Sequence, residues 1–212
     1  MKTSKLLLIS ALMMFMAFSA CKKDENVSGC GDVTSFTYGE ITYHTITIGT
    51  QCWMKENLNI GTKISGSSNQ TNNSGIEKFC YDNSDANCST YGGLYQWDEA
   101  MQYSQTKGSK GICAEGWHIP TDAEWTALVT FLGTNPGTKL KHNGTAGFEG
   151  LLAGYRTSSS TFTNNTQFGY FWTSTKSDAS QAYYRQLTSF DATATRNYNF
   201  KFLGFSVRCI KN

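Results

Sequence analysis

The 212-residue sequence contains little charge, little proline and little histidine. Charged residues make up 16% of the chain, and there are two prolines and three histidines. No pair of cysteines has the C-x-x-C spacing, and the histidines are scattered, so the ligand pattern of a structural zinc site is missing. The chain also lacks a G-x-S-x-G elbow, an H-E-x-x-H helix and a Walker loop. We therefore expect no catalytic residue, no bound metal and no cofactor.

The first residues have the pattern of an export signal. Lys2 and Lys5 precede an apolar run from Leu6 to Phe18, and Ser-Ala-Cys21 follows. The run is shorter than the roughly 20 residues that a membrane-spanning helix needs. A cysteine directly after Phe-Ser-Ala resembles a bacterial lipobox, which predicts cleavage after residue 20 and lipid attachment to Cys21. An ordinary secretory signal with a chance cysteine at the junction is the alternative.

A surplus of basic residues is also missing once the predicted signal peptide, residues 1–20, is removed. The 18 basic residues lose Lys2 and Lys5, and the remainder equals the 16 acidic residues. This balance argues against nucleic acid as a partner, because phosphate binding needs a positive surface. The run from Lys22 to Asn26 resembles the signal that sends some lipoproteins to the outer face of the outer membrane, although a solvated tether is the alternative. We expect residues 21–35 to be a tether attached to the membrane by its lipid, on an outer-membrane lipoprotein exposed at the cell surface.

Six cysteines remain after Cys21, and their even number in an exported chain predicts three disulfides. Cys80 and Cys88 are close enough in sequence to close their own loop, so we predict that they pair. The spacing leaves the connectivity of the others open. These are Cys30, Cys52, Cys113 and Cys209.

The clearest helix signal lies between Thr121 and Gly133. Thr121 and Glu124 have the spacing of a capping box, and Pro120 and Trp125 that of a hydrophobic staple. An apolar stripe at helical spacing follows, and Gly133 supplies a left-handed stop. The stripe consists of Trp125, Leu128, Val129 and Leu132. Leu94, Trp97 and Met101 predict a second, shorter helix.

The remaining segments favour strands separated by polar turns. The alternation in residues 41–48 predicts a strand, followed by another that includes residues 52–54. Residues 61–75 are predicted to be a polar loop that adds nothing to the core. Further strands are predicted at 151–156, 170–175, 182–187 and 205–210. Two helices followed by short antiparallel strands favour an α+β fold, and we place the domain at residues 36–212.

The order of several segments resembles the Fibrobacter succinogenes major paralogous domain family. The segments include IGTQCWMKENL, CAEGWHIPTDAEWTALV, LLAGYR, YFWTST, AYYRQL and GFSVRCIKN. The resemblance implies a C-type lectin-like fold, with two short helices, a small antiparallel sheet, long loops and disulfide staples. In lectin-like folds the last strand returns beside the helices, so the resemblance implies that Cys209 pairs with Cys113, which leaves Cys30 with Cys52. The family's biochemical role is generally unassigned.

The sequence gives little support for copper-dependent oxidase chemistry or for calcium binding. The related formylglycine-generating enzymes bind copper with two reactive cysteines near the end of the domain, whereas this chain has only Cys209 there. The loop Cys80–Cys88 offers oxygen ligands for calcium, but it lacks EF-hand spacing and the terminal glutamate. A disulfide-closed turn explains its acidic and amide residues better. These residues are Asp82, Asn83, Asp85 and Asn87. His118, which lies before the main helix, is expected to be a hydrogen-bonded core histidine.

Arginine and aromatic residues of the strand-rich half are the candidate ligand-binding residues. Aromatic side chains can stack on sugar rings or anchor a protein, and arginine supplies forked donors. Tyr183 and Tyr184 must face opposite sides of their strand, whereas the five tryptophans are better explained as core. The candidates are Arg156, Tyr184, Arg185, Arg196 and Tyr198.

The leading hypothesis is a monomeric surface lipoprotein whose non-catalytic domain binds a glycan or a protein, in adhesion or nutrient capture. The first alternative is a structural or assembly subunit of a surface complex or fimbria. The second is an oxidase related to the formylglycine-generating enzymes.

Overall fold

The computed structural model describes residues 29–212 of the protein. The predicted signal peptide and the predicted lipidation site, Cys21, lie outside the described residues. No helix within the described part of the chain is both long enough and apolar enough to cross a membrane.

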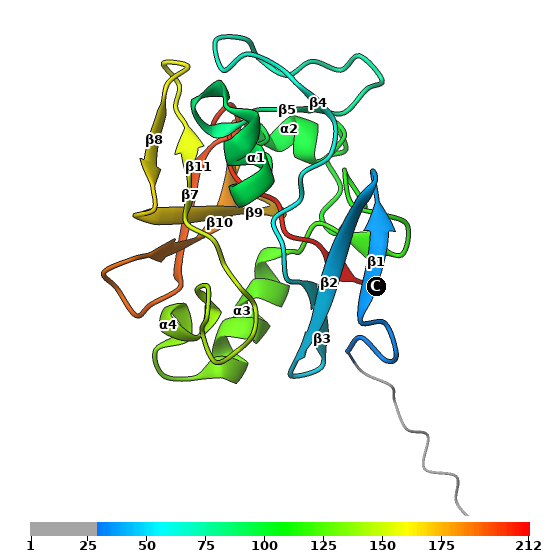
Figure 1. Cartoon of the computed structure of the whole chain (residues 1–212), viewed down its shortest axis with the longest axis vertical. Helices are drawn as coiled ribbons and strands as arrows, with labels where there is room; N and C mark the ends of the chain where they lie inside the picture. The colour runs from blue at the N-terminus through cyan, green and yellow to red at the C-terminus, as the bar shows by residue number, and fades with distance from the viewer. Residues whose placement is uncertain (1–28) are drawn as a thin grey trace, which may run out of the picture.

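Two five-stranded sheets form the framework (Figure 1). The first sheet is antiparallel throughout, and it places the last strand of the chain between two early ones. In spatial order its strands are β1 (Ser35–Tyr38), β2 (Ile41–Ile48), β3 (Gln51–Met54), β12 (Ile210–Lys211) and β6 (Trp117–His118). The two ends of the described chain therefore belong to one sheet.

The second sheet is antiparallel except where β7 runs parallel to β9. In its spatial order β11 and β8 are the edge strands, and β10 is paired with a strand along each of its two edges. The strands are β11 (Thr195–Phe200), β10 (Gln181–Thr188), β9 (Phe168–Lys176), β7 (Ala153–Arg156) and β8 (Phe162–Asn165). A separate parallel pair joins β4 (Thr62–Lys63) to β5 (Glu77–Lys78).

Short helices surround the sheets. Figure 1 shows α3 and α4 below the second sheet, and α1 and α2 above it near the β4–β5 pair. The helical segments are the 3-10 turn η1 (Tyr81–Asn83), α1 (Asp85–Tyr91), α2 (Trp97–Ala100), α3 (Asp122–Leu132) and α4 (Pro136–Leu140). The prediction of an α+β fold is confirmed, whereas the prediction of two helices and one small sheet underestimates both.

Helix α3 begins and ends where the sequence predicts. Thr121 Oγ1 accepts the Glu124 N–H at 3.2 Å, and the Glu124 carboxylate accepts the Thr121 N–H at 2.7 Å, which completes the capping box. The helix ends at Gly133, whose φ is 65°. Trp125 and Leu128 are fully buried, and Trp125 packs on rings of the second sheet and the following loop. The predicted helix is therefore confirmed as a core element.

The aromatic residues form the interior of the protein. All five tryptophans are buried, as predicted. The indole N–H of Trp97 donates to the carbonyl of Thr173 at 2.8 Å, and that of Trp172 donates to the carbonyl of Tyr95 at 2.8 Å. These bonds satisfy the polar ends of two otherwise apolar side chains and join α2 to the second sheet.

All three predicted disulfides are present. They join Cys30 to Cys52, Cys80 to Cys88 and Cys113 to Cys209. The last of these fastens the end of the chain to the segment that leads into α3.

Three predictions about local structure need correction. The helix predicted from Leu94, Trp97 and Met101 is shorter than that spacing indicates. It covers only Trp97–Ala100, because Leu94 is extended and bridges to Phe79. Residues 205–210 make isolated bridges instead of a continuous strand, because the segment crosses from the second sheet to the first. The loop 61–75 does contribute to the interior, since Gln70 is buried and donates and accepts hydrogen bonds with Gln96.

Candidate functional site

Two of the predicted ligand-binding residues are buried on β10. Tyr184 is 4% exposed and packs against Trp172 and Phe205. Arg185 is also 4% exposed, and its Nη2 donates to Thr126 Oγ1 at 2.6 Å and to Asp122 Oδ1 at 3.1 Å. Burial lowers the pKa of Arg185, and the Asp122 carboxylate partly offsets this effect. The surface role expected for these two residues is wrong, because both faces of β10 are covered at this point: Trp172 and Phe205 cover Tyr184, and α3 covers Arg185.

Arg156 is buried as well, with 2% of its surface exposed. Its Nε donates to the Gly66 carbonyl at 2.9 Å, its Nη2 to the Ser68 carbonyl at 2.8 Å, and its Nη1 to the Phe202 carbonyl at 3.2 Å. The guanidinium also lies 4.7 Å from the centre of the Phe79 ring. Arg156 therefore holds the loop 61–75 against the segment after β11, and the expectation that it meets a ligand directly is wrong.

Arg196 and Tyr198 lie at the surface, on the same face of the edge strand β11. The pairing of β10 with β11 places Tyr198 opposite Tyr183, and their rings meet edge to face at 6.0 Å. Arg196 stacks on the Tyr183 ring, 3.9 Å from the ring centre, and its Nε donates to Asp122 Oδ2 at 2.8 Å. The hydrogen bond from Arg196 to Asp122 raises the pKa of the guanidinium. Tyr183 and Tyr184 face opposite sides of β10, as predicted.

An exposed aromatic strip continues along β11 from Tyr198. We define the aromatic strip as Tyr198, Phe200 and Phe202, which are 51%, 43% and 43% exposed. The rings of Phe200 and Phe202 are stacked, with 5.1 Å between their centres and 9° between their planes. Large apolar rings that stay in water are unusual when they adjoin one another, so the aromatic strip is a candidate ligand surface.

The free edge of β11 is closed by its own asparagines. The Asn197 Oδ1 accepts the Tyr198 N–H at 2.9 Å, and the Asn199 Oδ1 accepts the Phe200 N–H at 2.9 Å. These N–H groups therefore point away from β10, which makes Tyr183 and Tyr198 a non-hydrogen-bonded pair with closely spaced side chains. Since these two outward donors are already occupied, this part of β11 is protected against the addition of another strand.

A polar pocket opens beside the last ring of the strip. Its volume is about 320 Å³, and Phe202 forms one wall. Four separate segments supply the lining, which makes the pocket a product of the tertiary fold. The lining residues are Asn69, Gln70, Gln96, Asp98, Glu99, Tyr103, Ala179, Ser180, Lys201 and Phe202.

The base of the polar pocket is a buried layer of hydrogen-bonded side chains. Glu99 is 1% exposed and accepts the Glu77 N–H at 2.8 Å and the Tyr103 hydroxyl at 2.9 Å. Burial raises the pKa of Glu99, whereas these two hydrogen bonds favour its charged form. The Gln96 side chain donates to the Phe202 carbonyl at 2.8 Å. The groups at the base are therefore largely occupied by one another.

Two charged groups of the polar pocket keep hydrogen-bonding capacity. The Asp98 carboxylate accepts one long hydrogen bond, from Gln105 at 3.5 Å, and forms no ion pair within the described residues. The Lys201 ammonium donates to the Ala179 carbonyl at 2.9 Å and lies 4.4 Å from the centre of the Trp97 ring. Burial lowers the pKa of Lys201, and Asp98 opposes this shift. An acceptor and a donor thus line the same small space.

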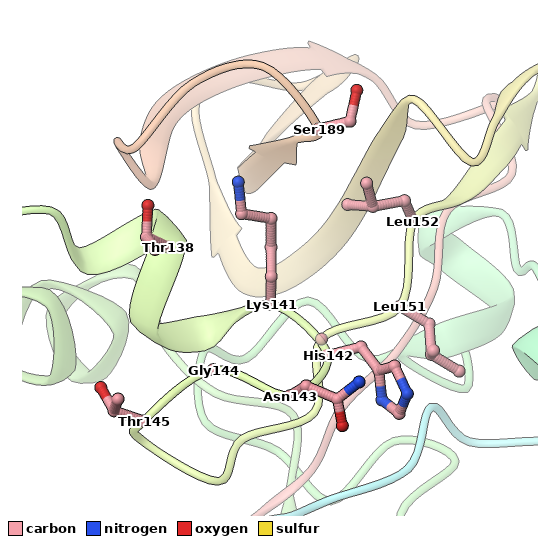
Figure 2. A pocket seen from close by; sticks show the side chains of 10 residues that line it. Thr138, Lys141, His142, Asn143, Gly144, Thr145, Leu151, Leu152 and Ser189 are labelled. Atoms are coloured by element: carbon pink, nitrogen blue, oxygen red, sulfur yellow. The ribbon is translucent and has the colours of Figure 1, made fainter.

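A larger cleft of about 490 Å³ lies at α4 and the loop that follows it (Figure 2). Figure 2 shows the Lys141 side chain extending from the end of α4 in the direction of Ser189. The Lys141 ammonium donates to the carbonyls of Thr188 and Asp191 at 2.9 and 3.0 Å, so it joins two loops. The cleft lining contains no buried charged side chain, unlike that of the polar pocket.

The possible calcium ligands make contacts within the fold. Asp85 forms an ion pair with Lys63 at 2.7 Å, Asn83 Oδ1 accepts the Gly66 N–H at 2.7 Å, and Asn87 donates to the Tyr81 carbonyl at 2.9 Å. Across residues 29–212, no three histidine, cysteine or acidic side chains are grouped so that they could hold a metal ion.

His118 makes the hydrogen bonds expected of a core histidine. One ring nitrogen lies 2.7 Å from Asn212 Oδ1, and the other lies 2.9 Å from Glu124 Oε1. Its side chain is 14% exposed. His118 therefore joins β6 to the capping box of α3 and to the end of the chain.

Comparison with known proteins identifies the family. The family model of the Fibrobacter succinogenes major domain matches residues 46–211. The chain belongs to this family. No curated protein and no solved structure matches it. The match to the Fibrobacter succinogenes major domain includes the aromatic strip, the polar pocket and five of the six disulfide cysteines.

Proposed function

We propose that this member of the Fibrobacter succinogenes major domain family is a non-catalytic binding protein that holds a glycan on the aromatic strip and in the polar pocket. The observation that carries the proposal is the continuity of the two features at Phe202. This residue ends the strip and also forms a wall of the pocket. Rings that contact the apolar face of a sugar, next to groups that bind its hydroxyls, are suited to carbohydrate.

The geometry of the strip supports a stacking role. The rings of Phe200 and Phe202 are stacked with nearly parallel planes, and Tyr198 continues the row along the same face of β11 as Phe200. Tyr183 packs against Tyr198, Arg196 stacks on Tyr183, and the Arg196 Nε–H donates to both carboxylate oxygens of Asp122. A row that is held in place loses little side-chain entropy when a ligand binds.

The non-catalytic assignment is part of the same proposal. The thiol that oxidase chemistry would need near the end of the domain belongs to Cys209, which is bonded to Cys113. We also propose that the fold is C-type lectin-like. It is supported by the return of β12 to the first sheet beside β3 and by the disulfide that holds it.

Display on the outer membrane completes the proposal. The lipobox at Cys21 and the charged residues after it are the sequence features in its favour. Protease treatment of intact cells tests it: a surface-exposed domain is degraded, whereas a domain that survives until the outer membrane is opened contradicts the assignment.

A glycan array with the full-length chain tests the binding function. We expect neutral oligosaccharides to bind, and Phe202→Ala or Tyr198→Ala to weaken binding by about tenfold or more, which corresponds to about 1.4 kcal/mol. Phe131→Ala is the matched control, because Phe131 is 65% exposed on α3 and packs on the β2–β3 turn at Gly49. No binding at millimolar glycan, or an equal loss in the Phe131 variant, would overturn the proposal.

A further inference from the structure

We infer that the polar pocket recognises the neutral terminal sugar of a glycan through two adjacent hydroxyl groups, and that it rejects acidic terminal sugars. This inference rests on the proposed function. It adds that the protein recognises the terminal sugar of the glycan and that this sugar is uncharged.

The size of the polar pocket favours a single ring. Its volume of about 320 Å³ lies at the lower end of the roughly 300–1,000 Å³ that ligand sites occupy. Its base is closed by the buried side chains of Gln70, Gln96 and Glu99. A glycan chain therefore enters by its end.

The aromatic strip gives the following sugars a path out of the pocket. From the wall at Phe202, the ring of Phe200 is stacked alongside, and Tyr198 lies two residues earlier on the same face of β11. Side chains two residues apart on a strand are about 7 Å from one another. The sugar units that follow the terminal sugar can therefore lie over Phe200 and Tyr198 while the terminal sugar occupies the pocket.

The free groups of the pocket match a pair of neighbouring hydroxyls. A hydroxyl donates one hydrogen bond and accepts others. Asp98 offers a carboxylate that is almost unoccupied, and Lys201 retains donors beyond its bond to the Ala179 carbonyl. One hydroxyl can donate to Asp98 while its neighbour accepts from Lys201, so an acceptor and a donor are both satisfied.

The charges in the pocket oppose an acidic sugar. Asp98 and Glu99 both line it, against the single ammonium of Lys201. The Arg156 guanidinium lies behind the wall, and its donors are bound to protein oxygens. A carboxylate on the ligand would have to enter beside Asp98, and like charges in a partly desolvated site discriminate between ligands by repulsion.

Calorimetry with the full-length chain tests the inference. The probes are a neutral oligosaccharide that the array identifies and the same oligosaccharide with a uronic acid as its terminal sugar. We expect the acidic probe to bind at least tenfold more weakly. Asp98→Asn should weaken the neutral probe by about tenfold and narrow the difference between the two probes.

Asp82→Asn provides the control for charge. Asp82 is exposed, and its φ of 52° is one that asparagine tolerates, so this variant makes the same charge change away from the pocket. It should bind both probes as the wild type does.

Each outcome of the calorimetry is decisive. If both probes bind equally and the strip variants still weaken binding, the inference is wrong and the proposed function stands. If Asp98→Asn binds as the wild type does, Asp98 does not read the sugar and the inference is overturned. If no glycan binds, both proposals fail. Should Asp98→Asn fail to fold, the comparison of the two probes on the wild type still decides the question of charge.

Discussion

The three disulfides close loops of very different length, and their removal should therefore destabilise the protein by different amounts. The paired cysteines are 96 residues apart for Cys113–Cys209, 22 apart for Cys30–Cys52 and 8 apart for Cys80–Cys88. A disulfide restricts the unfolded chain more when its loop is longer. The loop-entropy relation gives about 4.7, about 3.4 and about 2.5 kcal/mol for the three loops at 25 °C.

The structure makes the comparison a fair one. All six cysteines are nearly or fully buried, so replacing each pair by alanine removes similar packing from each site. The remaining difference between the three double variants should therefore follow loop length. Urea unfolding of each variant beside the wild type gives the free energies.

The expected order of destabilisation is loss of Cys113–Cys209 first, Cys30–Cys52 second and Cys80–Cys88 last. A Cys80→Ala/Cys88→Ala variant that loses as much stability as the Cys113→Ala/Cys209→Ala variant would refute the reasoning. It would mean that native-state contacts, or structure left in the unfolded chain, outweigh loop entropy.

Two further predictions concern single side chains. Arg156→Lys should cost about 3 kcal/mol in urea unfolding, because lysine cannot supply the forked, charge-assisted hydrogen bonds that hold Gly66, Ser68 and Phe202. It should also speed amide exchange in residues 61–75, and unchanged exchange there would contradict the positioning role. Burial disfavours charged His118, but hydrogen bonds to Glu124 and Asn212 outweigh it and raise the pKa of His118. The stability that this interaction contributes is present below the unfolded pKa of about 6.5 and is lost as pH rises through the folded pKa. His118→Ala should therefore destabilise the protein more at pH 5.5 than at pH 9. Urea unfolding at both pH values measures the difference, and a larger loss of stability at pH 9 would refute the prediction.

Features with a local cause could be predicted from the sequence. The cap and the stop of α3 depend on residues within a few positions of each other, so Thr121, Glu124 and Gly133 predict its bounds. The alternation of residues 41–48 likewise identifies β2. The pair Cys80–Cys88 follows from spacing, whereas the other two disulfides required the family resemblance.

The position of a residue in the sheet order could not be predicted in this way. The residue types of Tyr184 and Arg185 make them candidate ligand-binding residues, but the sequence does not show which segments cover the two faces of β10. The sequence of β11, TRNYNF, has polar residues on one face and exposed rings on the other, which leaves no hydrophobic alternation to identify it. Tyr184 is buried by Trp172 and Phe205, and Arg185 by α3.

The polar pocket could not be predicted from the sequence, because its lining residues are distant from one another in the chain. Its lining comes from residues near 70, 100, 180 and 201, and no two of these segments are adjacent in the chain. Arg156, which the sequence suggests as a ligand-binding residue, instead bonds protein carbonyls behind the wall of the pocket. An arginine with no acidic residue close in sequence is the one local signal that could have suggested a buried clamp for backbone carbonyls.

The placement of β12 has a consequence for the order in which the protein is made and folded. Ile210 pairs with Trp53 on one side and His118 on the other, so the interior of the first sheet stays open until residue 210 has been synthesised. Contacts between such distant residues form slowly, because a long loop must close first. The first sheet can therefore be completed only after nearly the whole domain has been synthesised, so the α3 helix and the second sheet must form, or wait, without a finished partner layer.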